Sequence, residues 1–207
     1  MKYCICYLLL LAGMLEINAR RHRAKVNDKL PITLYYEALC PYCMQFVTEQ
    51  LNPAMIRQDR LPYTELTLVP YGNARENEAG NVACQHGVDE CELNAWHACI
   101  LEHHDVIESL KLIACMMRSR KNKLDKCADR YNINVTAVKD CKKSRSVDDI
   151  LQKYAVATNR VPHSGVPAVA IDNVYNDQEQ EYISENFDAA FCAKYETKFD
   201  KKLPNCA

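Results

Sequence analysis

The stretch that decides the fold is PITLYYEALCPYCMQF, residues 31 to 46. Every second residue from Ile32 to Tyr36 is bulky and apolar, a pattern typical of a β-strand. Cys40 and Cys43 follow, and apolar residues then recur at helical spacing until Pro53, which we expect to kink or end the helix. The folded chain is therefore predicted to begin with strand, Cys-x-x-Cys and helix.

The rest of the chain has strand-like and helical parts. A second strand is expected at residues 64 to 72, and a short strand and turn at residues 168 to 175. A final helix should follow, capped by Ser184 or Asn186. Between the strands, helical periodicity dominates a block at about residues 85 to 160. This order predicts an α/β fold that carries a helical insertion.

Residues 1 to 19 are predicted to be a secretory signal peptide. Lys2 supplies a positive start, the apolar run that follows is too short to span a bilayer comfortably, and Ala19 is a small residue at a plausible cleavage point. A buried N-terminal helix is the alternative. Residues 20 to 30 form a basic lead-in without apolar periodicity, so we expect one folded domain at residues 31 to 206.

Composition narrows the classes of partner. Lysine and arginine total 26 and aspartate and glutamate 27, so the net charge is -1. That balance gives no electrostatic reason to expect a nucleic acid or a membrane surface as partner. Removal of the signal peptide would leave ten of the 12 cysteines in an oxidising compartment, which favours disulfides. Asn134 heads a sequon and is the expected glycosylation site.

The Cys-x-x-Cys motif predicts thiol–disulfide chemistry. Cys40 follows a strand and precedes a helix, where the positive end of the helix dipole stabilises a thiolate. We therefore expect Cys40 to be exposed, with a pKa well below the usual value of about 8.5, and to attack disulfides. Cys43 lies one helical turn later, so it should be buried and should resolve the mixed disulfide.

Two structural alternatives compete with this interpretation. A zinc site normally combines two closely spaced ligand pairs, whereas this chain has one Cys-x-x-Cys, and Cys99 and His103 would have to complete the site. A structural disulfide between Cys40 and Cys43 is the other alternative. We favour redox chemistry without a metal or an organic cofactor, because strand, Cys-x-x-Cys, helix is a redox context.

Val166-Pro167 is the expected substrate-binding element. Redox domains of the thioredoxin type place a cis-proline opposite the Cys-x-x-Cys, at the start of a strand, and Pro167 precedes such a strand. Only about 5–6% of X–Pro bonds are cis in folded proteins, and a proline that begins an edge strand is the alternative. Tyr42, between the two cysteines, is a further expected substrate contact.

The remaining cysteines form an even set that is compatible with four disulfides in about 105 pairings. If Cys91 and Cys99 share one helix, their Cα atoms lie roughly 12 Å apart, too far for a disulfide. Cys192 with Cys206 is the easiest local closure, and the helical block should hold at least two bridges. The eight cysteines are Cys84, Cys91, Cys99, Cys115, Cys127, Cys141, Cys192 and Cys206.

The segment CQHGVDECELNAWHAC, residues 84 to 99, concentrates polar residues among three cysteines. It is expected to form a stapled loop that turns at Gly87 and enters a helix. His86 could be an acid–base group or a histidine held by local hydrogen bonds, the more common case. The other histidines of this region are expected on the helix surface: His97, His103 and His104.

This segment carries a resemblance to a known family. Its spacing, with CPYC upstream, resembles the signature of the gamma-interferon-inducible lysosomal thiol reductases (GILT), and the resemblance extends over most of residues 31 to 206. The resemblance does not assign a separate chemical role to each residue of the signature. They are Cys84, Gln85, His86, Gly87, Glu90, Cys91, Asn94 and Cys99.

The resemblance implies a thioredoxin-like fold with a disulfide-rich helical insertion. It implies an enzyme that reduces protein disulfides in endosomes and lysosomes with Cys40 and Cys43 as the active pair. The compact signature looks like that of an invertebrate member, for which roles in immune defence have been proposed. Family members in mammals bear several glycans that assist lysosomal sorting, so a single sequon keeps secretion open as an alternative.

Three functional hypotheses follow. The first is a thiol reductase that acts on disulfide-containing proteins and is recharged by a small thiol. The second keeps the fold but reverses the direction, as a disulfide oxidase or isomerase, because direction depends on the reduction potential relative to the compartment. The third is a non-catalytic, disulfide-rich secreted binding protein.

Overall fold

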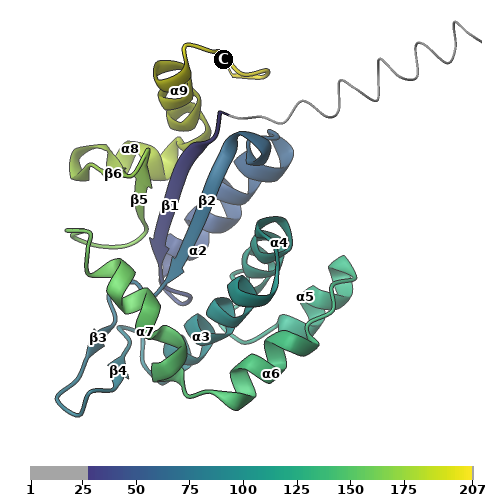
Figure 1. The fold of residues 1–207 in the computed structure, drawn as a ribbon, viewed down its shortest axis with the longest axis vertical. Coiled ribbons are helices and arrows are strands. Elements are labelled where there is room, and N and C mark those ends of the chain that lie inside the picture. Colours follow the sequence, from purple (N-terminus) through teal and green to yellow (C-terminus); the bar gives the residue numbers. More distant parts are fainter. Residues whose placement is uncertain (1–27, 207) are drawn as a thin grey trace, which may run out of the picture.

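A four-stranded sheet in the order β2-β1-β5-β6 forms the centre of the computed structural model, which describes residues 28–206. β1 (Leu30–Tyr36) pairs in parallel with β2 (Thr64–Pro70), whereas β5 (Ala168–Ile171) runs antiparallel to both β1 and β6 (Val174–Tyr175). The alternating pattern that predicted β1 is explained by its burial: its apolar side chains are inaccessible on the core side. Figure 1 shows helices on the faces and ends of this sheet.

The crossover from β1 to β2 contains the Cys-x-x-Cys motif. α2 (Pro41–Gln45) begins directly after Cys40 and continues into wider helical turns at Phe46–Leu51 and Pro53–Arg57. Pro53 therefore does not end the helical segment, contrary to one expectation. The turns widen instead, as the bond from the Asn52 N–H back to the Val47 carbonyl shows.

The insertion is a group of five helices that come between β2 and β5 in the sequence. Figure 1 shows it beyond the end of the sheet at which β1 terminates, with the short hairpin of β3 (Arg75–Glu76) and β4 (Val82–Ala83) beside it. The first part of the predicted helical block, residues 88 to 116, contains two helices. The five helices are α3 (Val88–His103), α4 (Val106–Met116), α5 (Leu124–Tyr131), α6 (Thr136–Ser144) and α7 (Val147–Thr158).

Two α-helices follow β6 in the described part of the chain. α8 (Gln180–Glu185) follows a short 3-10 turn, and α9 (Phe187–Phe199) packs its aromatic side chains into the core. Asn186 precedes α9 as expected, but its side-chain amide donates to the Tyr182 carbonyl at 3.4 Å rather than capping the helix. Ser184 lies inside α8, so its predicted capping role is wrong.

Four disulfides cross-link the chain within residues 28–206. As predicted, Cys91 and Cys99 have different partners, the local closure at the C-terminus forms, and the helical block holds two bridges of its own. The pairs are Cys84–Cys91, Cys99–Cys141, Cys115–Cys127 and Cys192–Cys206. The bridge from α3 to α6 and that from α4 to α5 tie the short insertion helices into one unit.

One predicted surface histidine is buried. His97 is 1% exposed, its Nδ1 lies 3.2 Å from the Tyr36 hydroxyl, and the two rings stack at 5.8 Å. Burial lowers the pKa of His97 to about 3, so the ring is neutral. The expectation failed because α3 is covered on nearly all sides; His103, near its end, is exposed as expected, and His104 is half-buried.

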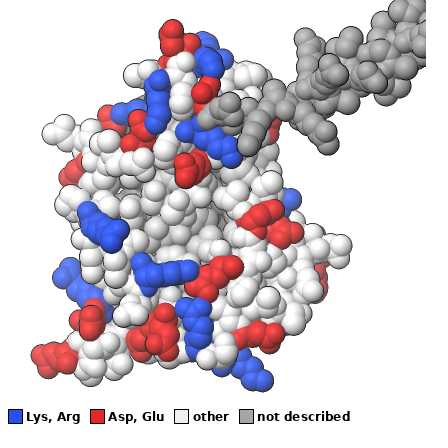
Figure 2. All heavy atoms as spheres, viewed as in Figure 1, with Lys and Arg blue, Asp and Glu red and all other residues white. Residues whose placement is uncertain are grey.

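The structure bears on membrane crossing only for the residues that it describes. Among residues 28–206, no helix combines the length and apolar character that crossing a membrane requires. The predicted signal peptide at residues 1 to 19 lies outside the described residues, as does most of the basic lead-in. Figure 2 shows acidic and basic side chains interspersed over one face, in keeping with the near-zero net charge.

Candidate active site

Cys40 and Cys43 are the free thiols within residues 28–206. Cys40 occupies the position just before α2 in an extended conformation, and its carbonyl accepts from the Met44 N–H at 2.9 Å. Cys43 lies inside the first turn and is fully buried. The two sulfurs are therefore not joined in a disulfide in this structure.

Access to Cys40 is narrower than the sequence led us to expect. Cys40 is 6% exposed, and its Sγ lies 3.6 Å from the Val166 carbonyl oxygen. The Val166–Pro167 bond is cis, and this turn brings the start of β5 against the sulfur. Little of Cys40 is therefore open to solvent in this structure.

The two thiols have opposite electrostatic environments. A hydrogen bond from the Cys43 thiol, assisted by the backbone N–H groups of Tyr42 and Cys43 and by the charge of His86, outweighs burial and lowers the pKa of Cys40 to about 6. Burial raises the pKa of Cys43 well above that of an ordinary thiol. The arrangement therefore holds one thiolate next to one protonated thiol.

This asymmetry predicts the pH dependence of thiol alkylation. Because only the thiolate reacts, the alkylation rate of Cys40 should rise with pH through a midpoint near 6, the value to which its pKa is lowered. About a tenth of the molecules would carry the thiolate at pH 5. Iodoacetamide labelling of the reduced protein, followed by mass spectrometry, measures this profile. A midpoint near 8.5 would contradict the stabilised thiolate.

A pair of buried carboxylates lies beneath the motif. Glu37, between β1 and Cys40, is fully buried, and its Oε2 accepts from the Asn73 N–H at 2.8 Å. Burial, together with the nearby charges of Glu90 and Cys40, raises the pKa of Glu37 to about 7. Glu37 is therefore protonated at acidic pH, when it can be accommodated without an uncompensated charge.

Gly72 makes room for this carboxylate. Its φ of +60° is disfavoured for other residues, and a Cβ there would lie 2.4 Å from Glu37 Oε2. The turn after β2 therefore packs directly against the Glu37 side chain and helps to exclude it from solvent.

The signature residues hold the segment that precedes Cys40. Glu90, on α3, is fully buried and accepts from the Leu39 N–H at 3.2 Å through Oε2. Asn94, one turn later, accepts from the Ala38 N–H at 2.8 Å. These bonds satisfy two backbone N–H groups in the segment that connects β1 to the motif. α3 therefore fixes the path of the chain that leads to Cys40.

His86 joins the two carboxylates. Its Nδ1 lies 2.7 Å from Glu90 Oε2 and 3.3 Å from Glu37 Oε1, and its backbone N–H donates to Glu90 Oε1 at 2.9 Å. The Cys84–Cys91 disulfide and the turn at Gly87, with a φ of +84°, close the loop that carries His86. A partly exposed imidazole thus bridges solvent and the buried acids.

The other predicted site residues lie at different distances from this cluster. Gln85 accepts from the Asn73 side chain at 2.6 Å at the edge of the cluster. Tyr42 is 73% exposed beside the cis-proline turn. Cys99 lies further along α3, in its bridge to α6, and contributes to the insertion rather than to the motif. Asn134 is exposed in the turn between α5 and α6.

Three residues of the site were missed by sequence reasoning. Glu37 and Asn73 belong to the buried acid cluster, and Arg120 donates to the Leu39 carbonyl at 3.4 Å. Glu37 had a usable signal, because a charged residue directly after a buried strand and just before a reactive motif invites a functional role. Asn73 and Arg120 lie in polar loops, where the sequence offered no signal of a functional role.

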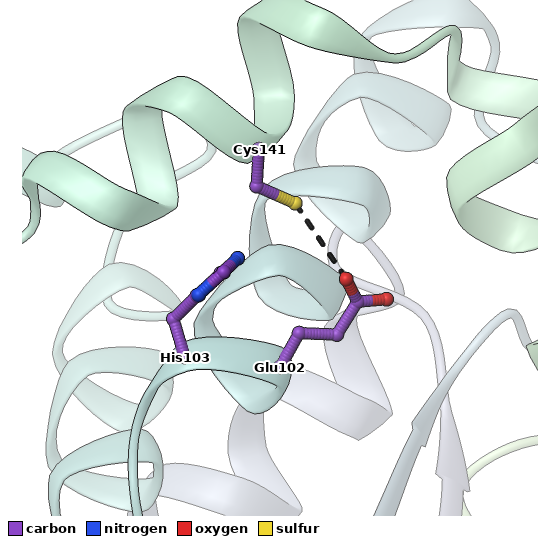
Figure 3. Close-up of side chains that lie close together, drawn as sticks. All are labelled: Glu102, His103 and Cys141. Carbon is purple, nitrogen blue, oxygen red and sulfur yellow. Dashed lines mark hydrogen bonds between the residues drawn. The ribbon is translucent and has the colours of Figure 1, made fainter.

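A group of potential metal ligands lies in the insertion, where Figure 3 shows Glu102, His103 and Cys141 side by side. Cys141 is bonded to Cys99, so neither sulfur can act as a thiolate ligand. Glu102 is engaged by Arg145 at 2.6 Å and by a lysine. The ligand set that the zinc alternative needed, with Cys99 and His103, is therefore not assembled.

Comparison with known proteins identifies the family. The family model described as gamma interferon inducible lysosomal thiol reductase (GILT) matches residues 31–131. A Drosophila melanogaster protein named GILT-like protein 2 is 64% identical over 206 residues, which cover 100% of both chains. The chain belongs to the GILT family. A GILT of Carassius auratus is 31% identical over 79% of this chain and 68% of its own length.

Solved structures show the same fold outside GILT. The chain matches the reduced form of the disulfide bond oxidoreductase DsbG of Mycobacterium tuberculosis with a TM-score of 0.59 and 17% identity, over 89% of this chain and 84% of that one. DsbA of Chlamydia trachomatis matches with a TM-score of 0.52 and 17% identity, over 78% and 88%. The expected thioredoxin-like α/β fold is confirmed, and with membership of GILT it makes the protein a thiol–disulfide oxidoreductase.

Proposed function

We propose that the protein is a thiol reductase of protein disulfides in which Cys40 is the nucleophile and Cys43 the resolving thiol. The observation that carries this proposal is the pair of free thiols with opposite pKa shifts at the start of α2. A non-catalytic binding protein would have no use for such a pair, and nothing in the site favours that hypothesis.

The reaction follows from the geometry. The Cys40 thiolate attacks one sulfur of the substrate disulfide, which forms a mixed disulfide and releases the other substrate sulfur as a thiolate. Cys43 then attacks Cys40 Sγ, and its proton is transferred to the departing substrate sulfur. This step closes the Cys40–Cys43 disulfide and expels the second substrate thiol. A small thiol reductant restores the two free thiols, so no metal or organic cofactor enters the cycle.

An oxidase or isomerase is the second candidate, and one observation favours it. Stabilising the thiolate stabilises the reduced protein, which makes the pair more oxidising. A Cys40 pKa of about 6 lies between the values of about 7 for thioredoxin and about 3.5 for the oxidant DsbA. The names of the GILT relatives favour reduction.

The proposed setting is an acidic endosomal or lysosomal lumen, or the extracellular space after secretion. The four disulfides and the exposed sequon at Asn134, with its expected glycan, support passage through the secretory pathway. The lowered pKa of Cys40 keeps a usable thiolate fraction at low pH. A role in immune defence is proposed from membership of GILT alone.

Reduction of insulin disulfides at pH 5 and pH 7, with a small thiol as the electron donor, tests the proposal. The wild-type protein should accelerate reduction at both values, and Cys40→Ser should not exceed the rate with the small thiol alone. Equal activity of the two proteins would overturn the proposal. A reduction potential near about −120 mV, the value of DsbA, would favour the oxidase.

A further inference from the structure

A groove with a volume of about 380 Å³ lies directly beside the candidate active site. Its apolar floor is formed by Phe46, which is buried, and by Val166 and Pro167 of the cis-proline turn. Tyr42, the most exposed of the aromatic residues near the motif, forms part of its wall.

The groove and the surroundings of the reactive sulfur share one residue, Val166. Val166 contributes to the floor and its carbonyl oxygen lies 3.6 Å from Cys40 Sγ. An extended chain advances about 3.3 Å per residue. A substrate whose half-cystine has reached Cys40 therefore places a residue one or two positions away over the groove.

The charged rim of the groove has a single sign. Glu181 and Glu185, one turn apart on α8, both line it and are both exposed. Neither forms an ion pair with any residue of the described part of the chain, whereas the neighbouring Glu179 is paired with Lys194 at 2.9 Å. The lining contains no lysine, arginine or histidine. Arg120, which donates to the Leu39 carbonyl, is not part of the lining.

We propose that this groove binds a lysine or arginine side chain next to the half-cystine of the substrate, so that the enzyme prefers disulfides in basic segments. The inference deepens the proposed function and rests on it. The methylene stem of such a side chain fits the apolar floor, while its charged head reaches the two glutamates. The unpaired carboxylates gain a partner only when substrate is bound.

Peptide disulfides that differ at one flanking position test the proposal. The set carries Lys, Gln or Glu one or two positions from one half-cystine, on either side, and kcat/KM is measured for each. A cation also makes any substrate thiol a better leaving group, so each rate is divided by the rate with dithiothreitol. We expect a corrected Lys-over-Glu preference of roughly tenfold on one flank at low ionic strength, and less at high salt.

The Glu181→Gln/Glu185→Gln double variant should lose most of this preference, because its rate on the Lys peptide falls toward its rate on the Gln peptide. Glu65→Gln, an exposed glutamate on β2 outside the groove, is the matched control and should retain the preference. A corrected ratio near one in the wild type, or the same ratio in the double variant, would overturn the proposed subsite.

Binding separates this inference from the proposed function. Cys40→Ser protein and peptides with serine in place of cysteine cannot react, so fluorescence anisotropy reports the groove alone. Tighter binding of the Lys peptide than of the Glu peptide, lost in the double glutamine variant, supports the subsite even if no reductase activity is found. Equal binding contradicts it even if disulfides are reduced.

Discussion

A Cys43→Ser variant is expected to stop after the first half of the reaction and to accumulate a covalent complex with its substrate. Cys40 can still attack, but the sulfur that lies beneath it to displace the substrate is missing. A well-placed intramolecular group acts as if present at roughly 10⁵ M or more, far above the millimolar concentration of a small thiol. Turnover should therefore fall by about 100-fold or more.

Non-reducing electrophoresis with mass spectrometry of the trapped species measures this outcome. The complex should disappear on addition of excess reductant and should never form with Cys40→Ser. A Cys43→Ala variant has no donor at this position and should lose the hydrogen bond that is the largest cause of the lowered Cys40 pKa, so its alkylation midpoint should move upward. If Cys43→Ser turned over at the wild-type rate and no trapped complex formed, Cys43 would not be the thiol that resolves the intermediate.

The second large effect is expected from Glu90→Gln. Glu90 accepts three hydrogen bonds from the chain around the site, two from His86 and one from the Leu39 N–H. A glutamine keeps the shape but offers one acceptor oxygen in place of two, so at least one buried donor loses its partner. We expect a loss of about 2–4 kcal/mol in the free energy of unfolding, because the lost bonds are to a buried charged group.

Chemical denaturation of the oxidised protein measures this change. Glu92→Gln is the matched control on the same helix, because Glu92 is 45% exposed and pairs with Lys142 on the surface; it should cost less than about 1 kcal/mol. Alkylation of Cys40 in Glu90→Gln should also change, because the backbone before the thiol is no longer held. Equal stability of the two variants would exclude the clamping role of Glu90.

The local features of the fold could be read from the sequence because they depend on neighbouring residues. β1, the start of α2 and the β5–β6 turn each follow from periodicity or from one residue with a strong conformational preference. The cis bond at Pro167 was anticipated from its place before a strand.

The interior of the site could not be read in the same way. The bonds from α3 to the backbone before Cys40 join residues more than 50 positions apart, and polarity alone does not reveal which buried donor a carboxylate serves. His97 was misplaced for a related reason. A helix that is enclosed on most sides has no polar face by which an inward histidine could be recognised.

The place of β5 in the sheet has a consequence for synthesis of the protein. The wall that covers Cys40 comes from Val166, 126 residues later in the chain. At translation rates of 5–20 residues per second, the nascent motif stays uncovered for roughly 6–25 s. During that interval the emerging helices deliver further cysteines one after another beside an unshielded nucleophile, so the order of bridge formation must compete with mispairing. Factors that hold or cap the motif until its wall arrives should raise the yield of correctly bridged chains.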